Sequence, residues 1–227
     1  MPNPPARRNK SRFPRAFALP LFILCLGLQA HGAIDSTIPA GNSFALFNGK
    51  DLSGWMAVPD SAKEGTWSAH DGVIAGTGMP KGYLRTLQTF ENYRLRVEWR
   101  WTNKPGNSGV FLHGSGEDKV WPHCFEAQLQ SGNAGELRAN GGSQFRTDSP
   151  PGARSMPKKA ASSERPAGEW NVYEIVCRDA DVSLSVNGVL QNELKGGTLK
   201  SGWIGLQAEG GDIEFRNLII EPLKPKS

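Results

Sequence analysis

The chain has 227 residues, of which 38% are hydrophobic and 9% aromatic, enough for one sizeable domain with a single core. Its formal net charge of +4 is unevenly placed, because five of its 26 Lys and Arg residues and none of its 22 Asp and Glu residues lie in residues 1–33. The remainder carries a net charge of −1 and no basic cluster larger than Lys158-Lys159, which argues against nucleic acid as a partner.

Residues 1–33 have the layout of a secretory signal peptide: a basic start, an apolar run over residues 16–28, and the small-residue sequence QAHGA. We expect cleavage near Gly32 or Ala33. The apolar run is short for a membrane span of ~20 residues, and an uncleaved anchor is the alternative. The sequence therefore predicts a single mature domain over residues 34–227, without a membrane span, that is periplasmic or secreted.

Two cysteines remain after residue 33, Cys124 and Cys177, and both lie in apolar runs typical of strands. Export permits a disulfide between them, but two buried thiols fit the same pattern. No spacing of Cys and His resembles a zinc site.

Beyond residue 40, short strands separated by turns account for most of the chain, with almost no helical periodicity. Residues 93–101, YRLRVEWRW, alternate strictly between apolar and charged side chains, and Asn187-Gly188 between two alternating runs is a strong hairpin signal. Further strands are expected within residues 44–49, 66–76, 83–90, 108–114, 123–132, 170–179, 202–211 and 212–223. Roughly ten to twelve strands at this spacing predict a β-sandwich or barrel.

Residues 132–169 do not fit this pattern, because they are rich in Pro, Ser and Ala and have no periodicity. Irregular connections longer than ~12–15 residues are unusual inside a compact domain and are often lids or binding loops. A solvated excursion is the other interpretation.

The alternating strands carry polar side chains of an unusual kind. Solvated strand faces favour Lys, Thr, Glu and Ser, whereas amides, carboxylates, an imidazole and a guanidinium recur here. These groups suit a ligand rich in hydroxyls, because they offer donors and acceptors at fixed positions. A wet outer face is the alternative for each row taken alone. The residues are Glu98, Arg100, His113, Glu126, Gln128, Gln130, Gln207 and Glu209, with Trp67, Tyr83 and Trp121 as possible stacking partners.

Motifs for several other chemistries are absent from the sequence. It contains no GxSxG nucleophile elbow, no phosphate-binding loop, no HExxH motif and no dinucleotide fingerprint.

Six segments in order resemble the 3-keto-disaccharide hydrolase domain family. They are FALFNGKDLSGW, GNSGVFLHG, FEAQLQSGNAGEL, GEWNVYEIVC, VNGVLQNE and IGLQAEGGDIEFRNLIIEPL, between about Phe44 and Leu223. The resemblance implies an all-β, concanavalin A-like jelly-roll sandwich of two antiparallel sheets, akin to laminarinase-type glucanases. It also implies export, a carbohydrate partner, and cleavage of glycosides oxidised to a ketone at C3 or hydration of the cleavage product.

One comparison with the laminarinase-type enzymes bears on mechanism. Those enzymes carry two catalytic carboxylates on one strand, whereas the similar row here is Glu126, Gln128 and Gln130. A retaining glycosidase needs two carboxyl groups ~5–5.5 Å apart, which this strand does not supply. A ketone at C3 acidifies the hydrogen on C2, so that a single base can begin the cleavage.

We therefore expect Glu126 as base or acid, His113 as its partner in proton transfer, and Arg100 as the group that stabilises the enolate. The other polar residues, Gln128, Gln130, Gln207, Glu209 and Glu98, are expected to bind substrate. A divalent cation is possible, although no spacing requires one. Two alternatives stay open: a non-catalytic carbohydrate-binding module, and an ordinary glycoside hydrolase whose second carboxylate is Glu98 or Glu209.

Overall fold

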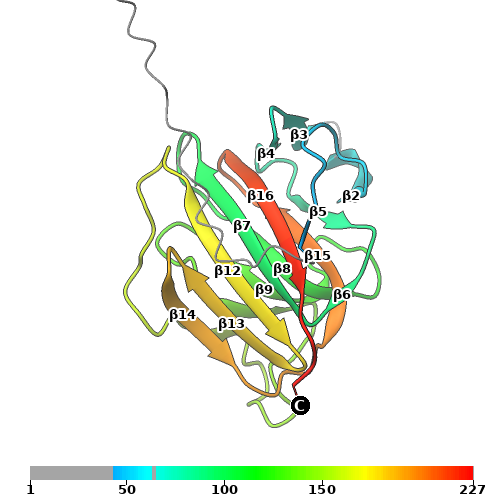
Figure 1. Cartoon of the computed structure of the whole chain (residues 1–227), viewed down its shortest axis with the longest axis vertical. Helices are drawn as coiled ribbons and strands as arrows, with labels where there is room; N and C mark the ends of the chain where they lie inside the picture. Colours follow the sequence, from blue (N-terminus) through cyan, green and yellow to red (C-terminus); the bar gives the residue numbers. More distant parts are fainter. Residues whose placement is uncertain (1–42, 63–64, 227) are drawn as a thin grey trace, which may run out of the picture. The chain divides into compact units, whose positions relative to one another are not determined.

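The computed structural model describes residues 43–62 and 65–226, and these form a sandwich of two antiparallel sheets (Figure 1). The predicted signal peptide, residues 1–33, lies outside the described residues. Helix is limited in the described part to one 3-10 turn, Asp60–Ala62. The all-β class predicted from the sequence is confirmed.

The first sheet consists of β1 (Phe44–Ala45), β3 (Trp67–His70), β4 (Val73–Gly76), β7 (Tyr93–Trp101), β12 (Asn171–Arg178), β13 (Asp181–Val186), β14 (Val189–Leu194) and β16 (Ile213–Pro222). Its strand order is β14-β13-β12-β7-β16-β4-β3, and β1 pairs with β16 beside this path. In Figure 1 this sheet is the layer nearer the viewer, in which β12, β7 and β16 lie side by side.

The second sheet consists of β2 (Trp55–Val58), β5 (Gly82–Thr86), β6 (Phe90–Glu91), β8 (Gly109–Ser115), β9 (His123–Gln128), β10 (Leu137–Asn140), β11 (Ser155–Met156) and β15 (Ser201–Ala208). Its order is β11-β10-β9-β8-β15-β5-β2, and β6 pairs with β15. Many neighbours in both sheets are distant in sequence, so the chain crosses repeatedly between the two layers.

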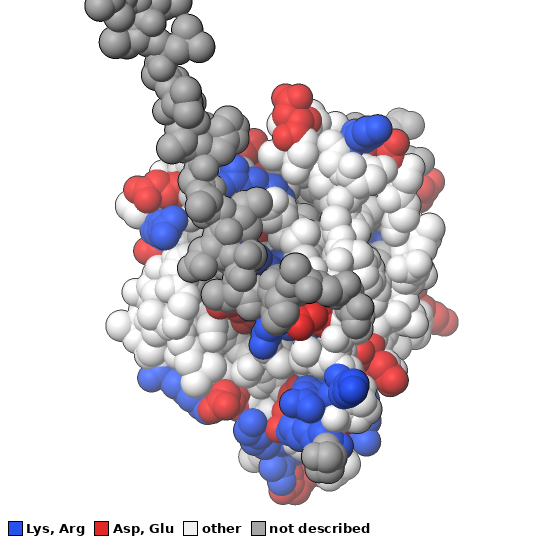
Figure 2. All heavy atoms as spheres, viewed as in Figure 1, with Lys and Arg blue, Asp and Glu red and all other residues white. Residues whose placement is uncertain are grey.

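Alternation along the strands decides which side chains form the core. In β7 the apolar residues Leu95, Val97 and Trp99 are fully buried between the sheets, and the charged residues between them face outward. Facing strands do the same, which gives one continuous core of aromatic and aliphatic side chains between the layers. Figure 2 shows acidic and basic side chains interspersed on the visible face, with basic ones gathered near the C-terminal end.

The turn predicted from the sequence at Asn187-Gly188 is present, and a second turn of the same kind lies in the first sheet. Asn187 and Gly188 link β13 to β14 with left-handed φ angles of 49° and 81°, which Asn and Gly tolerate best. The Asn187 side chain also accepts a hydrogen bond from the backbone N–H of Val172 at 2.8 Å, so it fixes the turn against β12. Asp71 and Gly72 make the corresponding turn between β3 and β4.

The Pro-rich segment over residues 132–169 is more ordered than the sequence indicated, because β10 and β11 lie within it. The Glu164 carboxylate accepts backbone N–H groups of Gly132 and Ala134 at 3.2 and 3.1 Å. The backbone N–H of Lys159 donates to Gln191 of β14 at 2.7 Å. The segment thus runs from β11, an edge of the second sheet, to β14, an edge of the first, and covers strand edges that would otherwise be open to pairing.

Cys124 and Cys177 are both free and buried, so the alternative of two buried thiols holds in the structure. Cys124 belongs to β9 of the second sheet and Cys177 to β12 of the first. In the described part of the chain, no helix is long and apolar enough to cross a lipid bilayer.

Candidate active site

The outer face of the second sheet, which is turned away from the core, carries the polar row of β9. Phe125 and Ala127 point into the core, and Glu126 and Gln128, which alternate with them along the strand, point to the other face. Both polar residues are nevertheless buried, with exposed fractions of 3% and 1%. A solvated outer face would leave them open to water, so this part of the face is enclosed.

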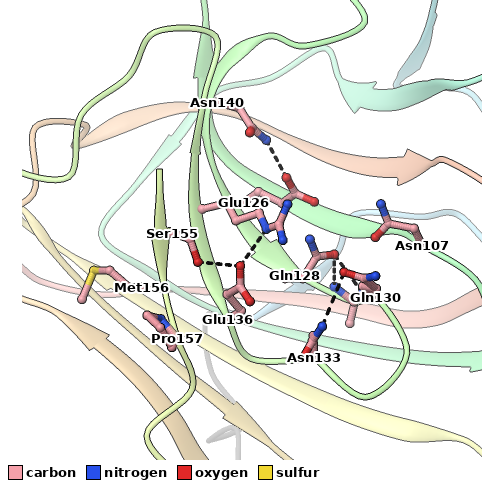
Figure 3. Close-up of polar contacts among 12 residues, drawn as sticks. Asn107, Glu126, Gln128, Gln130, Asn133, Glu136, Asn140, Ser155, Met156 and Pro157 are labelled. Carbon is pink, nitrogen blue, oxygen red and sulfur yellow. Dashed lines mark hydrogen bonds and ion pairs between the residues drawn. The ribbon is translucent and has the colours of Figure 1, made fainter. Parts of the chain in front are cut away.

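Glu126 is the most perturbed carboxyl group on this face. Its Oε2 accepts a hydrogen bond of 2.5 Å from Nδ2 of Asn140 in β10, whereas its buried Oε1 has no hydrogen-bond partner (Figure 3). Burial raises the pKa of Glu126 from 4.5 to about 7, and the Asn140 hydrogen bond and the charge of Arg138 offset part of that rise. A carboxyl group with this pKa exchanges protons readily near neutral pH.

Gly109 provides the space into which Oε1 points. It lies in β8 opposite Gln128, and a Cβ atom at this position would come within 2.5 Å of Oε1 of Glu126. The backbone of Gly109 does not have a left-handed φ, so any residue could adopt its conformation. Glycine is needed at this position because a side chain would overlap the Glu126 carboxylate. The carboxylate therefore leans over the bare backbone of the neighbouring strand.

β10 adds a second alternating polar row beside Glu126. Arg138 pairs in register with Glu126, and its Nε donates to Oε1 of Glu136 at 2.8 Å. The Ser155 hydroxyl donates to the same oxygen at 2.7 Å. Asn140 and Arg138 of β10, with Glu136 just before this strand, thus place an amide, a guanidinium and a carboxylate beside β9.

Glu209 organises the other side of the site. Its Oε2 accepts from Nδ2 of Asn107 at 2.6 Å and from Nε2 of Gln207 at 3.2 Å, and its Oε1 accepts from Nζ of Lys81 at 3.3 Å. The negative charge of Glu209 also contributes to the raised pKa of Glu126, which places the two carboxylates within electrostatic reach of each other.

A pocket of about 540 Å³ opens beside this network. It is lined by Lys104, Pro105, Gly106, Asn107, Gln130, Ser131, Glu209, Gly210 and Gly211. Its volume lies within the ~300–1,000 Å³ of small-molecule sites. Gly106 and Gly210 come so close that a Cβ on Gly106 would overlap the carbonyl of Gly210, so these glycines allow the two loops to form one wall.

Gln128 and Gln130 have different surroundings. Oε1 of Gln128 accepts the backbone N–H groups of Leu129 and Gln130 at 2.9 and 2.8 Å, so this side chain closes the end of β9. Gln130 lines the pocket, and its Oε1 lies 3.5 Å from Nδ2 of Asn133. Of the two amides, Gln130 is the one available to a ligand in the pocket.

An aromatic cluster occupies the outer face directly beside Glu126, because Phe111 of β8 pairs in register with Glu126. Tyr83 stacks on Trp203 with ring centroids 5.2 Å apart, and Phe111 meets the Tyr83 ring edge-on at 5.4 Å. The Arg85 guanidinium lies over Trp203 and forms two hydrogen bonds with Asp118, at 2.9 and 3.0 Å. Tyr83 is fully buried in this cluster, whereas Trp121, in the loop before β9, is 46% exposed and available for stacking.

His113 lies on the core-facing side of the second sheet. The pairing of β8 with β9 shifts register around it, and its φ is 55°, so the side chain points away from the outer face. Its ring meets Tyr93 of the first sheet at 5.6 Å, and Nδ1 lies 3.1 Å from the carbonyl oxygen of Leu199. Burial lowers the pKa of His113 from 6.5 to about 4. The structure does not bring His113 and Glu126 together.

Arg100 and Glu98 lie in β7, on the outer face of the first sheet and therefore on the opposite side of the sandwich. Nε of Arg100 donates to Glu214 at 2.6 Å. The two oxygens of Glu98 accept from Arg96 and Arg216 at 3.0 and 2.8 Å. Both predicted residues are thus held in ion pairs on the first sheet, away from Glu126.

Sequence reasoning missed the partners that β10 and the loop before β8 supply. Glu136, Arg138 and Asn140 alternate in the sequence GELRAN, which was a readable signal inside a segment expected to be irregular. Asn107 gave no such signal. Among the residues described, no group of three or more His, Cys, Asp or Glu could hold a metal ion.

Comparison with known proteins finds one family and several similar folds. The model of the family described as 3-keto-alpha-glucoside-1,2-lyase-like domain matches residues 43–221. A 3-keto-disaccharide hydrolase of Bacteroides thetaiotaomicron is 23% identical, over 84% of this chain and 82% of the relative.

Two solved structures show the same architecture. A protein of Parabacteroides distasonis classed provisionally as a glycosyl hydrolase superposes with a TM-score of 0.61, at 20% identity, over 81% of this chain and 94% of its own. The β-glucanase of Bacillus licheniformis superposes with a TM-score of 0.54, at 12% identity, over 82% of this chain and 100% of its own. The predicted concanavalin A-like jelly-roll sandwich is confirmed.

Proposed function

Because the chain belongs to the family of 3-keto-alpha-glucoside-1,2-lyase-like domains, we propose that it cleaves glycosides whose sugar is a ketone at C3, with Glu126 as the base. One observation carries the proposal: Oε1 of Glu126 is buried without a hydrogen-bond partner, and the pKa of this carboxyl group is about 7. Such a group holds a proton weakly enough to accept and release one at neutral pH.

The proposed reaction begins at C2. Oε1 of Glu126 takes the proton from C2, and the electron pair of the C–H bond forms an enolate with the C3 ketone. The ketone then re-forms, a double bond forms between C1 and C2, and the bond from C1 to the leaving oxygen breaks. That oxygen takes up a proton, from Glu126 or from water, and leaves as an alcohol. Addition of water, with hydroxyl at C1 and a proton at C2, completes a net hydrolysis.

Arg138 takes the role in enolate stabilisation that the sequence analysis gave to Arg100. It is the cation paired in register with Glu126, and its side chain is 39% exposed, so a ligand can reach it. A fixed positive charge beside a developing oxyanion lowers the barrier to its formation. His113 has no step in this proposal, because it faces the core.

Asn140 determines which oxygen of Glu126 reacts. Its Nδ2 donates a hydrogen bond of 2.5 Å to Oε2, and such short hydrogen bonds are typical of charged acceptors. Proton transfer is therefore left to Oε1, above Gly109. A carboxylate can bind sugar hydroxyl groups without a raised pKa, whereas proton transfer near neutral pH benefits from the pKa of about 7, which favours an enzyme over the carbohydrate-binding alternative.

A conventional glycoside hydrolase is the second candidate, because Glu209 is a second carboxylate within electrostatic reach of Glu126. Glu209 already accepts hydrogen bonds from two amides and a lysine, which favours a role in holding these side chains over a role as proton donor. The predicted export of the chain to the periplasm or beyond agrees with either activity and stays a prediction.

Activity of matched variants tests the proposal. Wild type should release the alcohol from a 3-keto-glucoside and leave the parent glucoside intact, and Glu126→Gln should lose at least about 100-fold in kcat. Glu98→Gln, a carboxylate of similar burial on the other sheet, should retain turnover. Circular dichroism checks that both variants fold. Full turnover by Glu126→Gln would refute the role of Glu126, and equal cleavage of the parent glucoside would favour the conventional hydrolase.

A further inference from the structure

Two buried amide oxygens beside Glu126 have no hydrogen-bond partner. They are Oδ1 of Asn107 and Oε1 of Gln207, and the Gln207 side chain is 2% exposed. An unpaired buried acceptor costs roughly 1–3 kcal/mol of desolvation, so protein interiors rarely keep two of them side by side. Their presence points to a ligand that supplies the missing donors.

Glu209 fixes the orientation of both amides. A carboxylate can only accept hydrogen bonds, so each amide must turn its NH₂ group toward Oε2, at 2.6 Å for Asn107 and 3.2 Å for Gln207. The carbonyl oxygens must then point away from Glu209. This orientation follows from chemistry alone, because flipping either amide would place two acceptors against each other.

The two oxygens lie close to the reactive oxygen of Glu126. Leu206 pairs with Val110, and the same register continued by one residue sets Gln207 opposite Gly109, one strand spacing of about 4.8 Å away. Gly109 lies directly beneath Oε1 of Glu126. Asn107 precedes Gly109 by two residues and lines the 540 Å³ pocket, so one member of the pair borders the pocket and the other lies beside Gly109.

The chemistry of the pair selects what can bind there. A protonated Glu126 offers a single donor, so at least one of the two oxygens stays unpaired without a ligand. A hydroxyl group can donate to an amide oxygen, whereas a ketone oxygen, an ether or a fluorine cannot. Nζ of Lys81 donates to Glu209, Nε of Arg138 donates to Glu136, and the Arg85 guanidinium donates to Asp118.

We propose that Asn107 and Gln207, held by Glu209, form an acceptor pair that reads free hydroxyl groups of the sugar and excludes its ketone. The assignment of a sugar rests on the proposed function, and Glu209 is a positioning residue rather than a catalytic one. The oxidised carbon of the ring must then face another side of the site, where Arg138 supplies a donor. The pair therefore sets the orientation in which the ring presents C2 to Glu126.

Fluorinated analogues of a 3-keto-glucoside, each with one hydroxyl replaced by fluorine, test the acceptor pair. At least one analogue should lose roughly 10- to 100-fold in kcat/KM with wild type, because a buried acceptor is left unpaired. Gln207→Met removes the amide oxygen but keeps a side chain of similar length. With this variant, kcat/KM for the affected analogue should lie within about threefold of kcat/KM for the unmodified substrate. If every analogue reacts within threefold of the parent, or if the penalty persists in Gln207→Met and in Asn107→Leu, the acceptor pair is refuted.

Glu209→Gln provides a second variant with a distinct signature. A glutamine at this position can donate as well as accept, so the two amides are no longer forced to present oxygen. The hydroxyl penalty should shrink, and the pH dependence of kcat should shift to lower pH, because a negative charge that raises the pKa of Glu126 is removed. An unchanged penalty in Glu209→Gln would refute its positioning role.

Binding to a Glu126→Ala variant, which has neither the base nor an NH₂ group that could pair with the two amide oxygens, separates this inference from the proposed reaction. Calorimetric titration with the unoxidised glucoside and its fluorinated analogues should show the same hydroxyl penalty without any turnover. If that penalty is present but wild type does not cleave the 3-keto-glucoside, the proposed function fails and the acceptor pair stands. If wild type cleaves the substrate but no penalty appears in binding or turnover, the acceptor pair fails alone.

Discussion

Replacing Glu126 by glutamine should make the protein more stable at alkaline pH. The folded-state pKa of Glu126 is raised from 4.5 to about 7 by burial, so ionising this group disfavours the fold. The associated stability is fully present below pH ~4.5 and is lost as pH rises through about 7. A shift of about 2.5 units corresponds to roughly 3 kcal/mol at pH 8.5, as an upper value. Glutamine carries no charge and avoids this loss.

Thermal unfolding of wild type and Glu126→Gln at pH 4.5 and pH 8.5 measures the effect. For a domain of this size, 1 kcal/mol corresponds to about 2–4 °C in Tm, so the variant should gain up to roughly 6–12 °C over wild type on going from acid to alkaline pH. Comparing the two pH values cancels any constant effect of the new amide. Parallel Tm profiles for the two proteins would refute the view that Glu126 is a strained, buried carboxylate.

Three further changes have expected outcomes. Gly109→Ala puts a Cβ within 2.5 Å of Oε1 of Glu126. We expect kcat to fall at least tenfold and the free energy of unfolding, measured in urea, to fall by ~1–3 kcal/mol. Gly65→Ala, whose Cβ would meet Pro80 at an ordinary 3.5 Å, is the control and should change neither quantity. Arg138→Ala should lower kcat about 100-fold and Arg100→Ala less than threefold in the same assay. The reverse order would show that Arg100, not Arg138, stabilises the enolate. Because the pKa of His113 is lowered to about 4 in the folded protein, the neutral imidazole stabilises the fold above pH ~6.5, and this stability is lost as pH falls toward 4. His113→Phe should therefore lose less Tm than wild type over that range, and the pH dependence of kcat should not change.

Much of the fold was predictable because local rules and global packing agree in it. The alternation of residues 93–101 gave the buried and exposed faces of β7, and Asn187-Gly188 gave a hairpin. Alternation also placed Glu126 and Gln128 on one face. Burial of that face was not predictable, because it depends on loops from distant parts of the chain.

The misplaced candidates show where the sequence stops being informative. His113 falls at a register shift with a left-handed φ, and such a bulge breaks the period of two on which alternation depends. Arg100 and Glu98 alternate as cleanly as Glu126, but nothing in a single strand tells which of two sheets it joins. Asn140 and Arg138 were hidden by Pro- and Ser-rich neighbours that suggested a structureless loop.

The fate of the hydrogen on C2 tests the central claim most directly. A 3-keto-glucoside carrying deuterium at C2 should lose that deuterium to water at every turnover by wild type, as followed by mass spectrometry of the released sugar. The loss should exceed that of a protein-free control and of Glu126→Gln, because removal of this atom by Glu126 begins the reaction. Products that keep their deuterium while the alcohol is released would show that the bond at C1 breaks without an enolate, and would contradict the account.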